Sequence, residues 1–290
     1  MKNIKITDVR CNPGDSAFLI DDGETSILYD SGFGFTGFSV AENIKKALGE
    51  RKLDYIFLTH SHYDHALGSA YVLKYWNDAV VVAGEYAADI FKRDGAKKLM
   101  RELDGAFAKE CGVSDYEFLG DDLRVDVAVK DGDVVKAGGM TFEAVALPGH
   151  TKCSFGFYCR ENKLLLSSET LGVYDGNDTV LPSFLVGYNM ALESMKKVKK
   201  YDINTILIPH IGVLSEEKTK YFLSVMEERA QYFADLIVNF IKDKKTDEEI
   251  TEYFIKTYRK DYITEIYPVS AMSLNVSIMI KLIKKEFGLV

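Results

Sequence analysis

The sequence predicts an α+β protein: a four-layer αββα sandwich followed by a C-terminal helical appendage. Short apolar segments separated by Gly and Asp turns alternate with amphipathic helical segments, and the order strands, helix, strand, helix occurs twice. After residue 214 the strand signals stop and long amphipathic helices follow. We therefore predict a catalytic sandwich over residues 1–214 and a helical lobe over residues 215–290, which covers a cleft or forms an interface.

The first half of the sandwich is expected to alternate strands and helices. The strands share a short apolar run bounded by Gly, Asp or Pro: Ile4–Val9, Ala17–Ile20, Thr25–Tyr29, Tyr55–Thr59 and Ala79–Ala83. The helices share apolar residues at i, i+3 and i+4 or a high content of charged residues: Val40–Leu48, a helix that begins at about 64–66, and an insert over 85–112.

The second half repeats this order and leads into the helical lobe. Its expected strands are Val125–Val129, Met140–Ala146, Ser154–Cys159, Lys163–Ser167 and Thr205–Ile208, with a helix at Tyr188–Lys200. In the lobe, Ser215 is a helix N-cap and Thr246–Glu249 reads as a capping box. The last segment, about 270–286, is apolar on nearly all sides. We expect it to pack against the sandwich or a second subunit, which would make a homodimer through the C-terminal helices.

Composition limits the classes of function. The chain has 290 residues, 47% of them hydrophobic, which is enough for a large core. A net charge of −8 and a pI near 5.3 argue against a nucleic-acid partner, because that needs a basic face. No apolar window is long enough to span a membrane, and no secretory h-region follows Met1, so we expect a cytoplasmic protein. The four cysteines form no C-x-x-C pair, and we interpret them as buried, reduced thiols.

The histidines carry the functional signal. The chain has five, and three of them, His60, His62 and His65, lie with Asp64 in the stretch LTHSHYDHAL where an apolar strand ends. The other two, His150 and His210, each follow a further expected strand. Strand ends at one rim of a sheet are where a site is normally built. Imidazole with carboxylate suits zinc, iron or manganese, so the pattern predicts a metal site.

These residues carry a resemblance to a known family. Thr59–His65 resembles the T-H-x-H-x-D-H signature of the metallo-β-lactamase superfamily, and Asp30-Ser31-Gly32 and Pro148–Thr151 resemble its D-[TS]-G and P-G-H-[ST] loops. The strand end at Pro209-His210 resembles its last metal histidine, and the order and spacings match from about residue 15 to 215. The resemblance implies two divalent metal ions. Zinc is the preferred metal, and iron and manganese are the alternatives. The resemblance places His60, His62 and His150 around one ion, and Asp64, His65 and His210 around the other.

One motif departs from the family pattern. The family's bridging aspartate is expected where this chain has Glu169, in the stretch Leu165–Gly172. A glutamate still offers two oxygens, but its carboxylate lies one methylene further from the backbone. We interpret Glu169 as a metal ligand; the alternative is an exposed acid at a strand end, which leaves one tightly bound ion.

Such a site predicts hydrolysis without a covalent protein intermediate. Three neutral histidines leave a coordination position open, and the ion lowers the pKa of bound water so that hydroxide can attack a carbonyl carbon or phosphorus. Asp64 is the candidate catalytic residue, which orients the water or takes its proton. No serine has a G-x-S-x-G setting, so a serine nucleophile is not expected.

The helical lobe after the last metal histidine resembles the layout of glyoxalase II and of the quinolone-signal response thioesterase. We therefore favour a small-molecule thioester or ester over a phosphodiester as substrate. Tyr174, Phe184 and Tyr188 form an apolar, aromatic segment that could line the cleft or pack in the core.

Two alternatives remain. The same ligands could hold iron in an oxidoreductase, as in the persulfide dioxygenases and flavodiiron proteins of this superfamily, although the flavodiiron pattern has a glutamate where this chain has His62. The chain could instead hold metal as a binding or regulatory protein with little catalysis.

Overall fold

The computed structural model describes residues 4–177 and 179–289. The chain divides into two compact units, Met1–Ala146 with Phe155–Leu166, and Leu147–Ser154 with Ser167–Val290. The units are interleaved in sequence, because two short segments of the chain pass from one unit to the other and back. The boundary predicted near residue 214, between a catalytic sandwich and a helical lobe, is a division by function and stays a prediction.

The first unit is built on a six-stranded sheet. Its strands, in spatial order, are β1 (Lys5–Asp8), β2 (Phe18–Asp21), β3 (Ser26–Tyr29), β4 (Tyr55–Phe57), β5 (Val80–Gly84) and β6 (Val127–Val129). The pairs from β1 to β3 are antiparallel and the pairs from β3 to β6 are parallel. The apolar runs of β3 to β5 are almost completely buried, as expected for parallel strands covered on both faces.

The first unit also contains four antiparallel strands that face this sheet. They are β7 (Val134–Ala137), β8 (Met140–Ala146), β9 (Phe155–Cys159) and β10 (Leu164–Leu166), in the order β10-β9-β8-β7. Phe57 of β4 packs on Phe142 of β8 and Phe157 of β9, with ring centroids 5.3 and 4.7 Å apart. These buried rings join the two sheets, so the core of the unit lies between them.

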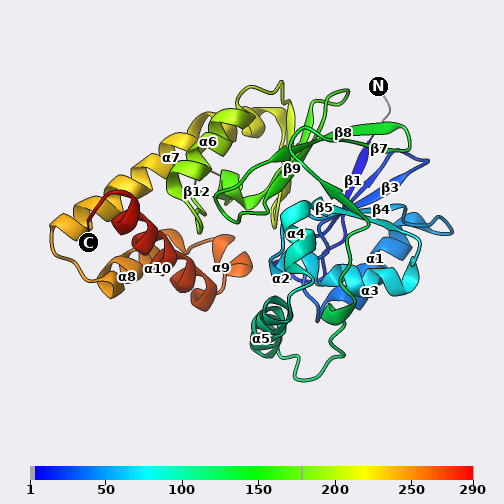
Figure 1. Ribbon diagram of the computed structural model, residues 1–290, viewed down its shortest axis with the longest axis horizontal. Helices are drawn as coiled ribbons and strands as arrows, with labels where there is room; N and C mark the ends of the chain where they lie inside the picture. The colour runs from blue at the N-terminus through cyan, green and yellow to red at the C-terminus, as the bar shows by residue number, and fades with distance from the viewer. Residues whose placement is uncertain (1–3, 178, 290) are drawn as a thin grey trace. The chain divides into compact units, whose positions relative to one another are not determined.

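Helices alternate with the strands of the first sheet along the chain. They are α1 (Gly37–Leu48), α2 (Tyr63–Ala66), α3 (Gly68–Tyr75), α4 (Glu85–Ile90) and α5 (Asp94–Glu110). Figure 1 shows α1 and α3 together on the side of the sheet away from β8 and β9. The short α2 contacts α5, so the helical insert supports the segment that follows β4.

The second unit is mainly helical. Its elements are the 3-10 turn η2 (Glu169–Leu171), the hairpins β11 (Val173–Tyr174)–β12 (Val180–Leu181) and β13 (Thr205–Ile208)–β14 (Gly212–Val213), and the helices α6 (Tyr188–Val198), α7 (Glu216–Lys242), α8 (Asp247–Tyr258), α9 (Ile263–Ile266) and α10 (Val269–Glu286). Helix α7 contacts α6 and α10, and α10 also contacts α8 (Figure 1). The expected N-cap at Ser215 and the capping box at Thr246 are both present.

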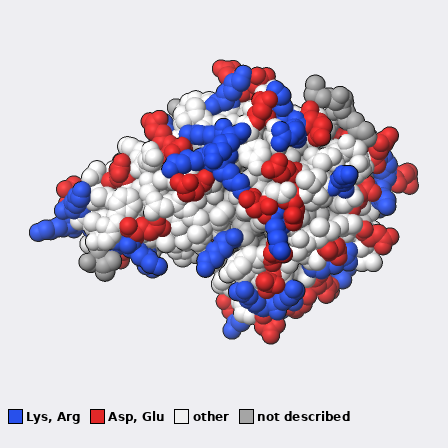
Figure 2. All heavy atoms as spheres, turned by 45° about the horizontal axis from the view of Figure 1, so that its top comes forward, with Lys and Arg blue, Asp and Glu red and all other residues white. Residues whose placement is uncertain are grey.

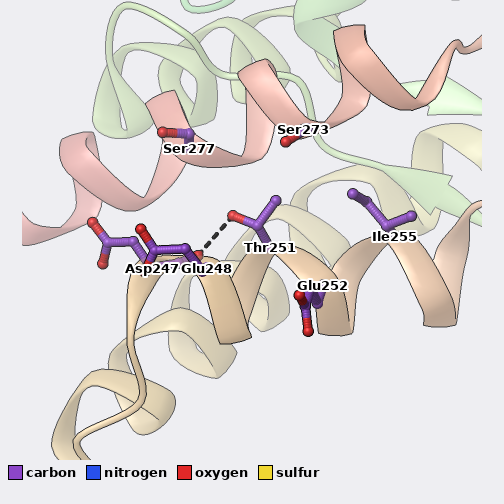
Figure 3. A pocket seen from close by; sticks show the side chains of 7 residues that line it. All are labelled: Asp247, Glu248, Thr251, Glu252, Ile255, Ser273 and Ser277. Atoms are coloured by element: carbon purple, nitrogen blue, oxygen red, sulfur yellow. Dashed lines mark hydrogen bonds between the residues drawn. The ribbon is translucent and has the colours of Figure 1, made fainter.

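A hollow of about 370 Å³ separates parts of α8 and α10. Figure 3 shows Ser273 and Ser277 on α10 across from Asp247 and Thr251 on α8, and the Thr251 hydroxyl donates to the Asp247 carbonyl. Met272, Val276, Met279, Ile280 and Ile283 of α10 are buried, whereas Leu274 is more than half exposed. The expectation that this segment packs against the sandwich or a second subunit stays a prediction.

The surface carries both signs of charge. Figure 2 shows Lys and Arg interspersed with Asp and Glu over the visible face. Within the described residues, no helix is long and apolar enough to cross a membrane. Cys153 and Cys159 are buried free thiols as expected, but Cys11 and Cys111 are exposed, which corrects the expectation that all four are buried. Both exposed cysteines lie outside the strands and helices.

Candidate metal centre

Four of the predicted ligands lie together in the first unit, and we call them the first half-site: His60, His62, Asp64 and His65. The chain leaves β4 at Phe57, and these residues occupy the following loop and α2. The ring centroid of His60 lies 4.6 Å from that of His62 and 4.1 Å from that of His65. His60 and His65 are fully buried, whereas His62 and Asp64 are partly exposed, so solvent reaches the half-site at these two side chains.

A buried carboxylate at the end of β3 organises this half-site. Asp30 has a left-handed backbone, with φ of 50°, and is fully buried. One of its oxygens, Oδ2, accepts hydrogen bonds from Nδ1 of His65 at 2.7 Å and from the Ser16 hydroxyl at 2.9 Å. The other, Oδ1, accepts from the backbone N–H of Thr59 at 2.8 Å. The Asp30-Ser31-Gly32 motif is therefore the support of the histidine loop.

The hydrogen bonds also fix which ring nitrogen of each histidine can bind a cation. The Thr59 hydroxyl lies 3.0 Å from Asp30 Oδ1 and 2.9 Å from Nδ1 of His60. Since it can donate only its one proton to the carboxylate, it accepts from Nδ1–H of His60. His65 likewise donates from Nδ1 to Asp30. Both imidazoles then present the lone pair of Nε2, as metal-ligating histidines do.

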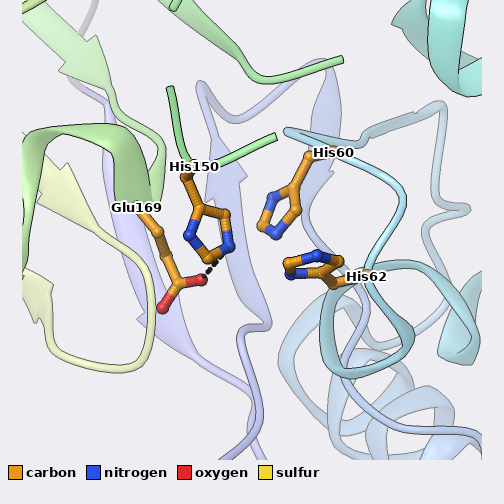
Figure 4. A group of neighbouring side chains, drawn as sticks. All are labelled: His60, His62, His150 and Glu169. Carbon is orange, nitrogen blue, oxygen red and sulfur yellow. Dashed lines mark ion pairs between the residues drawn. The ribbon is translucent and has the colours of Figure 1, made fainter. Parts of the chain in front are cut away.

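The remaining predicted ligands lie together in the second unit and form the second half-site: His150, Glu169 and His210. His150 lies in the loop after β8, Glu169 opens η2, and His210 lies in the turn between β13 and β14. Oε2 of Glu169 is 2.8 Å from Nε2 of His150 (Figure 4), and Oε1 is 3.4 Å from Nε2 of His210. All three side chains are buried, which argues against an exposed acid at position 169.

Ser183 orients His150 in the same way. Nδ1 of His150 lies 3.0 Å from the carbonyl oxygen of Ser183 and 2.8 Å from its hydroxyl. A carbonyl only accepts, so Nδ1 carries the proton and Nε2 again presents its lone pair toward Glu169. The backbone N–H of His150 donates to the Thr170 hydroxyl, which donates in turn to the carbonyl of Leu147. The loop that carries His150 is thus held at both the side chain and the backbone.

The donor geometry within each half-site fits a metal ion. The Nε2 lone pair of His150 faces a carboxylate oxygen at 2.8 Å, and Nε2 of His65 lies 3.5 Å from Oδ2 of Asp64. Two acceptors this close repel each other unless a cation or a proton lies with them. Nitrogen and oxygen ligands at about 2.0–2.2 Å from one zinc ion lie about 3 Å apart. The residues present therefore suit a bound cation.

Comparison with known proteins decides the family. Residues 14–210 match the sequence profile of the family described as Metallo-beta-lactamase superfamily. The chain belongs to this superfamily. The resemblance carried by the four sequence motifs, and with it the α+β metallo-β-lactamase fold with C-terminal helices, is confirmed.

Sequence identity to individual members of the superfamily is low. The metallo-beta-lactamase fold-containing protein ST1585 of Sulfurisphaera tokodaii is 27% identical over 186 residues, which cover 61% of this chain and 69% of that protein. A crystal structure of ST1585 superposes with a TM-score of 0.63 and 18% identity, covering 97% of this chain and 98% of that one.

Two enzymes of the superfamily are also similar to part of the chain. Hydroxyacylglutathione hydrolase GloC of Haemophilus influenzae is 25% identical over 171 residues, 58% of this chain and 72% of that protein. Ribonuclease Z of Bradyrhizobium diazoefficiens is 29% identical over 170 residues, 55% of this chain and 50% of that protein.

In the present protein, the aromatic residues predicted to line the cleft are packed inside the second unit. Tyr174 and Phe184 are fully buried and Tyr188 is 7% exposed. The Tyr174 ring packs on Phe222 of α7, and the ring of Tyr188 packs on Phe287 near the C-terminus. Their contact with substrate stays a prediction.

Sequence reasoning missed a second aromatic group, beside the first half-site. Phe33, which follows the Asp30 motif, packs on Tyr63 of α2 and on Phe107 of α5, with centroids 5.6 and 4.8 Å apart. Tyr63 lies between His62 and Asp64 in sequence and is partly exposed. The alternation of aromatic and small residues in Phe33-Gly34-Phe35 was the available signal.

Proposed function

We propose that the protein is a metal-dependent hydrolase that acts on a small-molecule thioester or ester. The observation that carries the proposal is the pairing of Nε2-presenting histidines with carboxylate oxygens at 2.8–3.5 Å inside each half-site. Membership of a superfamily that includes hydrolases supports the same conclusion.

The family motifs support two divalent ions, most simply zinc. By these motifs, His60, His62 and His150 belong to one ion, and Asp64, His65 and His210 belong to the other, and all six are residue types that bind metal ions. Glu169 directs one oxygen to a histidine of each set, which supports a bridging role for its carboxylate.

When bound, such ions supply Lewis-acid polarisation of a carbonyl oxygen and a water molecule of lowered pKa. The chain contributes the rest. Asp30, Thr59 and Ser183 keep the imidazoles in the tautomer that exposes Nε2. The side chain of Asp64 is about one-fifth exposed, so it can accept a proton from water or orient it.

The substrate class follows from two considerations. GloC is named as a hydrolase of hydroxyacylglutathione, a thioester, which supports thioester chemistry on this scaffold. Similarity to ribonuclease Z would point to a phosphodiester substrate. However, the net charge of −8 and the mixed charges of the visible face (Figure 2) suit binding of a polyanion poorly. We therefore place small thioesters and esters ahead of phosphodiesters.

The test measures metal content together with activity on a panel of thioesters, esters and phosphodiesters. We expect stoichiometric transition metal and hydrolysis that is lost in His62→Ala and reduced at least 100-fold in Asp64→Ala. The matched control is Asp89→Ala, an exposed carboxylate of α4 that should leave the rate unchanged. Oxygen consumption by an iron-loaded protein would favour the oxidoreductase instead. Full metal occupancy without turnover of any compound would favour a binding protein.

A further inference from the structure

The backbone at His210 is held in an unusual conformation. The N–H of Ile211 donates to the carbonyl of Ile208 at 3.3 Å, which closes a four-residue turn between β13 and β14. His210 is the third residue of this turn and has φ of 64°, whereas Pro209 precedes it. Turns with Pro second and a positive φ third normally place Gly or Asn there. A histidine in this position is strained, so the surrounding structure must hold it.

The contact that holds it comes from the C-terminal helices of the same unit. The hydroxyl of Tyr262 donates a hydrogen bond to the carbonyl oxygen of His210 at 3.1 Å. Tyr262 stands directly before α9, more than fifty residues along the chain from the turn. The bond therefore ties the peptide that leaves His210 to the helical lobe.

The donor is presented by a well-anchored segment. Nε of Arg259 donates to the carbonyl of Tyr267 at 2.9 Å and its Nη2 donates to that of Thr264 at 3.1 Å, so one guanidinium holds two carbonyls of the segment that follows Tyr262. Ile263 and Ile266 of α9 are buried. The Tyr262 hydroxyl thus has a fixed place from which to restrain the turn.

We propose that Tyr262 is a positioning residue for the metal centre. It holds the His210 peptide in the left-handed turn and so keeps Nε2 of His210 near Glu169. This inference rests on the proposed metal centre and adds to it a role for the helical lobe: the lobe sets the geometry of one metal ligand. Without the hydroxyl, the turn is free to relax toward negative φ, which swings the imidazole away from the carboxylate.

The test compares Tyr262→Phe with the wild-type chain and with Tyr267→Phe. The control removes a hydroxyl from the same segment, one that accepts a hydrogen bond from the side chain of Asn275 in α10. Zinc affinity is measured by competition with a chelator, and the geometry is read from the visible absorption of the cobalt(II)-loaded proteins. We expect Tyr262→Phe to bind one ion about tenfold more weakly and to shift its cobalt bands, because supporting contacts typically contribute 10–100-fold in metal affinity.

Tyr267→Phe should match the wild-type chain in both readouts, and all three proteins should melt within a few degrees of one another. Equal affinities and spectra for Tyr262→Phe and wild type, with two ions bound, would overturn this inference and leave the metal centre intact. A wild-type chain that takes up no ion would overturn the metal centre and the role of Tyr262 together. A loss of affinity in both tyrosine variants would show a general effect of the segment and would overturn the specific role of Tyr262.

Discussion

Asp30 and His65 form a buried pair in which the carboxylate accepts from Nδ1 of the imidazole at 2.7 Å, and neither side chain is exposed. The same carboxylate accepts from the backbone and hydroxyl of Thr59, so a single side chain supports both ends of the histidine loop. Its removal would leave several buried donors without an acceptor, and each unsatisfied buried donor lowers the stability of the folded state.

We expect Asp30→Asn to lower the free energy of unfolding by about 2–3 kcal/mol, because the amide nitrogen would face donors in place of an acceptor. Metal affinity should fall about tenfold or more, since His65 loses its orienting partner. Chemical denaturation and chelator competition measure the two effects. Ser16→Ala is the control, because it removes one bond to Asp30 and leaves His65 held; similar affinities in the two variants would contradict the role of the pair.

Glu169 spans two histidines, with Oε2 at 2.8 Å from Nε2 of His150 and Oε1 at 3.4 Å from Nε2 of His210. A side chain one methylene shorter is expected to reach only one of them. We expect Glu169→Asp to keep one contact and to weaken one ion, and Glu169→Gln to lose at least one ion per chain because the charge is gone. Metal content by mass spectrometry after dialysis checks both. Glu193→Gln on α6, an exposed position, should bind as the wild type does. Two retained ions in Glu169→Gln would rule out a bridging carboxylate.

Asp104 of α5 predicts a pH dependence of stability. Burial raises the pKa of Asp104 to about 6, against hydrogen bonds from Tyr116 and Gly34 that lower it. Because the folded pKa lies above the unfolded value of 3.8, the folded state retains the proton to higher pH. The stabilisation is fully present below about pH 4 and is lost as the pH rises through 6, by about 2–3 kcal/mol.

Asp104→Asn removes this ionisation. Its free energy of unfolding should change less between pH 4 and 7 than that of the wild-type chain, and Asp115→Asn at an exposed position should follow the wild type. Urea denaturation at a series of pH values measures the slopes. Parallel curves for wild type and Asp104→Asn would refute the assignment.

The apolar periodicity predicted the parts of the fold that burial dictates. The fully apolar run at 79–83 became β5, and the capping signals at Ser215 and Thr246 marked the starts of α7 and α8. Strand β7 was missed because it is only four residues long and alternates exposed with buried residues, so that Val134 is 59% exposed and the strand shows no continuous buried run. Elements that depend on a partner strand for their definition, such as the two-residue β14, leave no periodic signal in the sequence.

The candidate site, like the fold, could be predicted from the sequence only in part. Ligand types are visible in sequence because His60, His62 and His65 lie in one motif at a strand end. The groups that orient them are visible only in space: Ser183 lies 33 residues from His150 and belongs to no motif. Asp30 and Thr59 lie within recognised motifs, but which nitrogen each imidazole exposes follows from their hydrogen bonds and not from their spacing.

Gly68 provides a sharp test of how the Asp30 loop is packed. It is the first residue of α3, and its N–H donates to the carbonyl of Gly32 at 3.1 Å. A Cβ at this position would lie 1.8 Å from the carbonyl oxygen of Ser31, so backbone would have to move. We expect Gly68→Ala to lower the free energy of unfolding by about 3 kcal/mol, as overpacking of a filled core does.

The matched control is Gly95, in the first turn of α5, where a Cβ meets nothing within 4 Å. Gly95→Ala should be neutral or stabilise the protein by up to about 1 kcal/mol, because alanine favours the helix. The same denaturation experiment measures both variants. Since Ser31 donates its N–H and hydroxyl to the carbonyl of His65, the displacement caused by Gly68→Ala should also reach the first half-site and weaken metal binding. A stable Gly68→Ala protein with unchanged metal affinity would mean that this loop does not position His65.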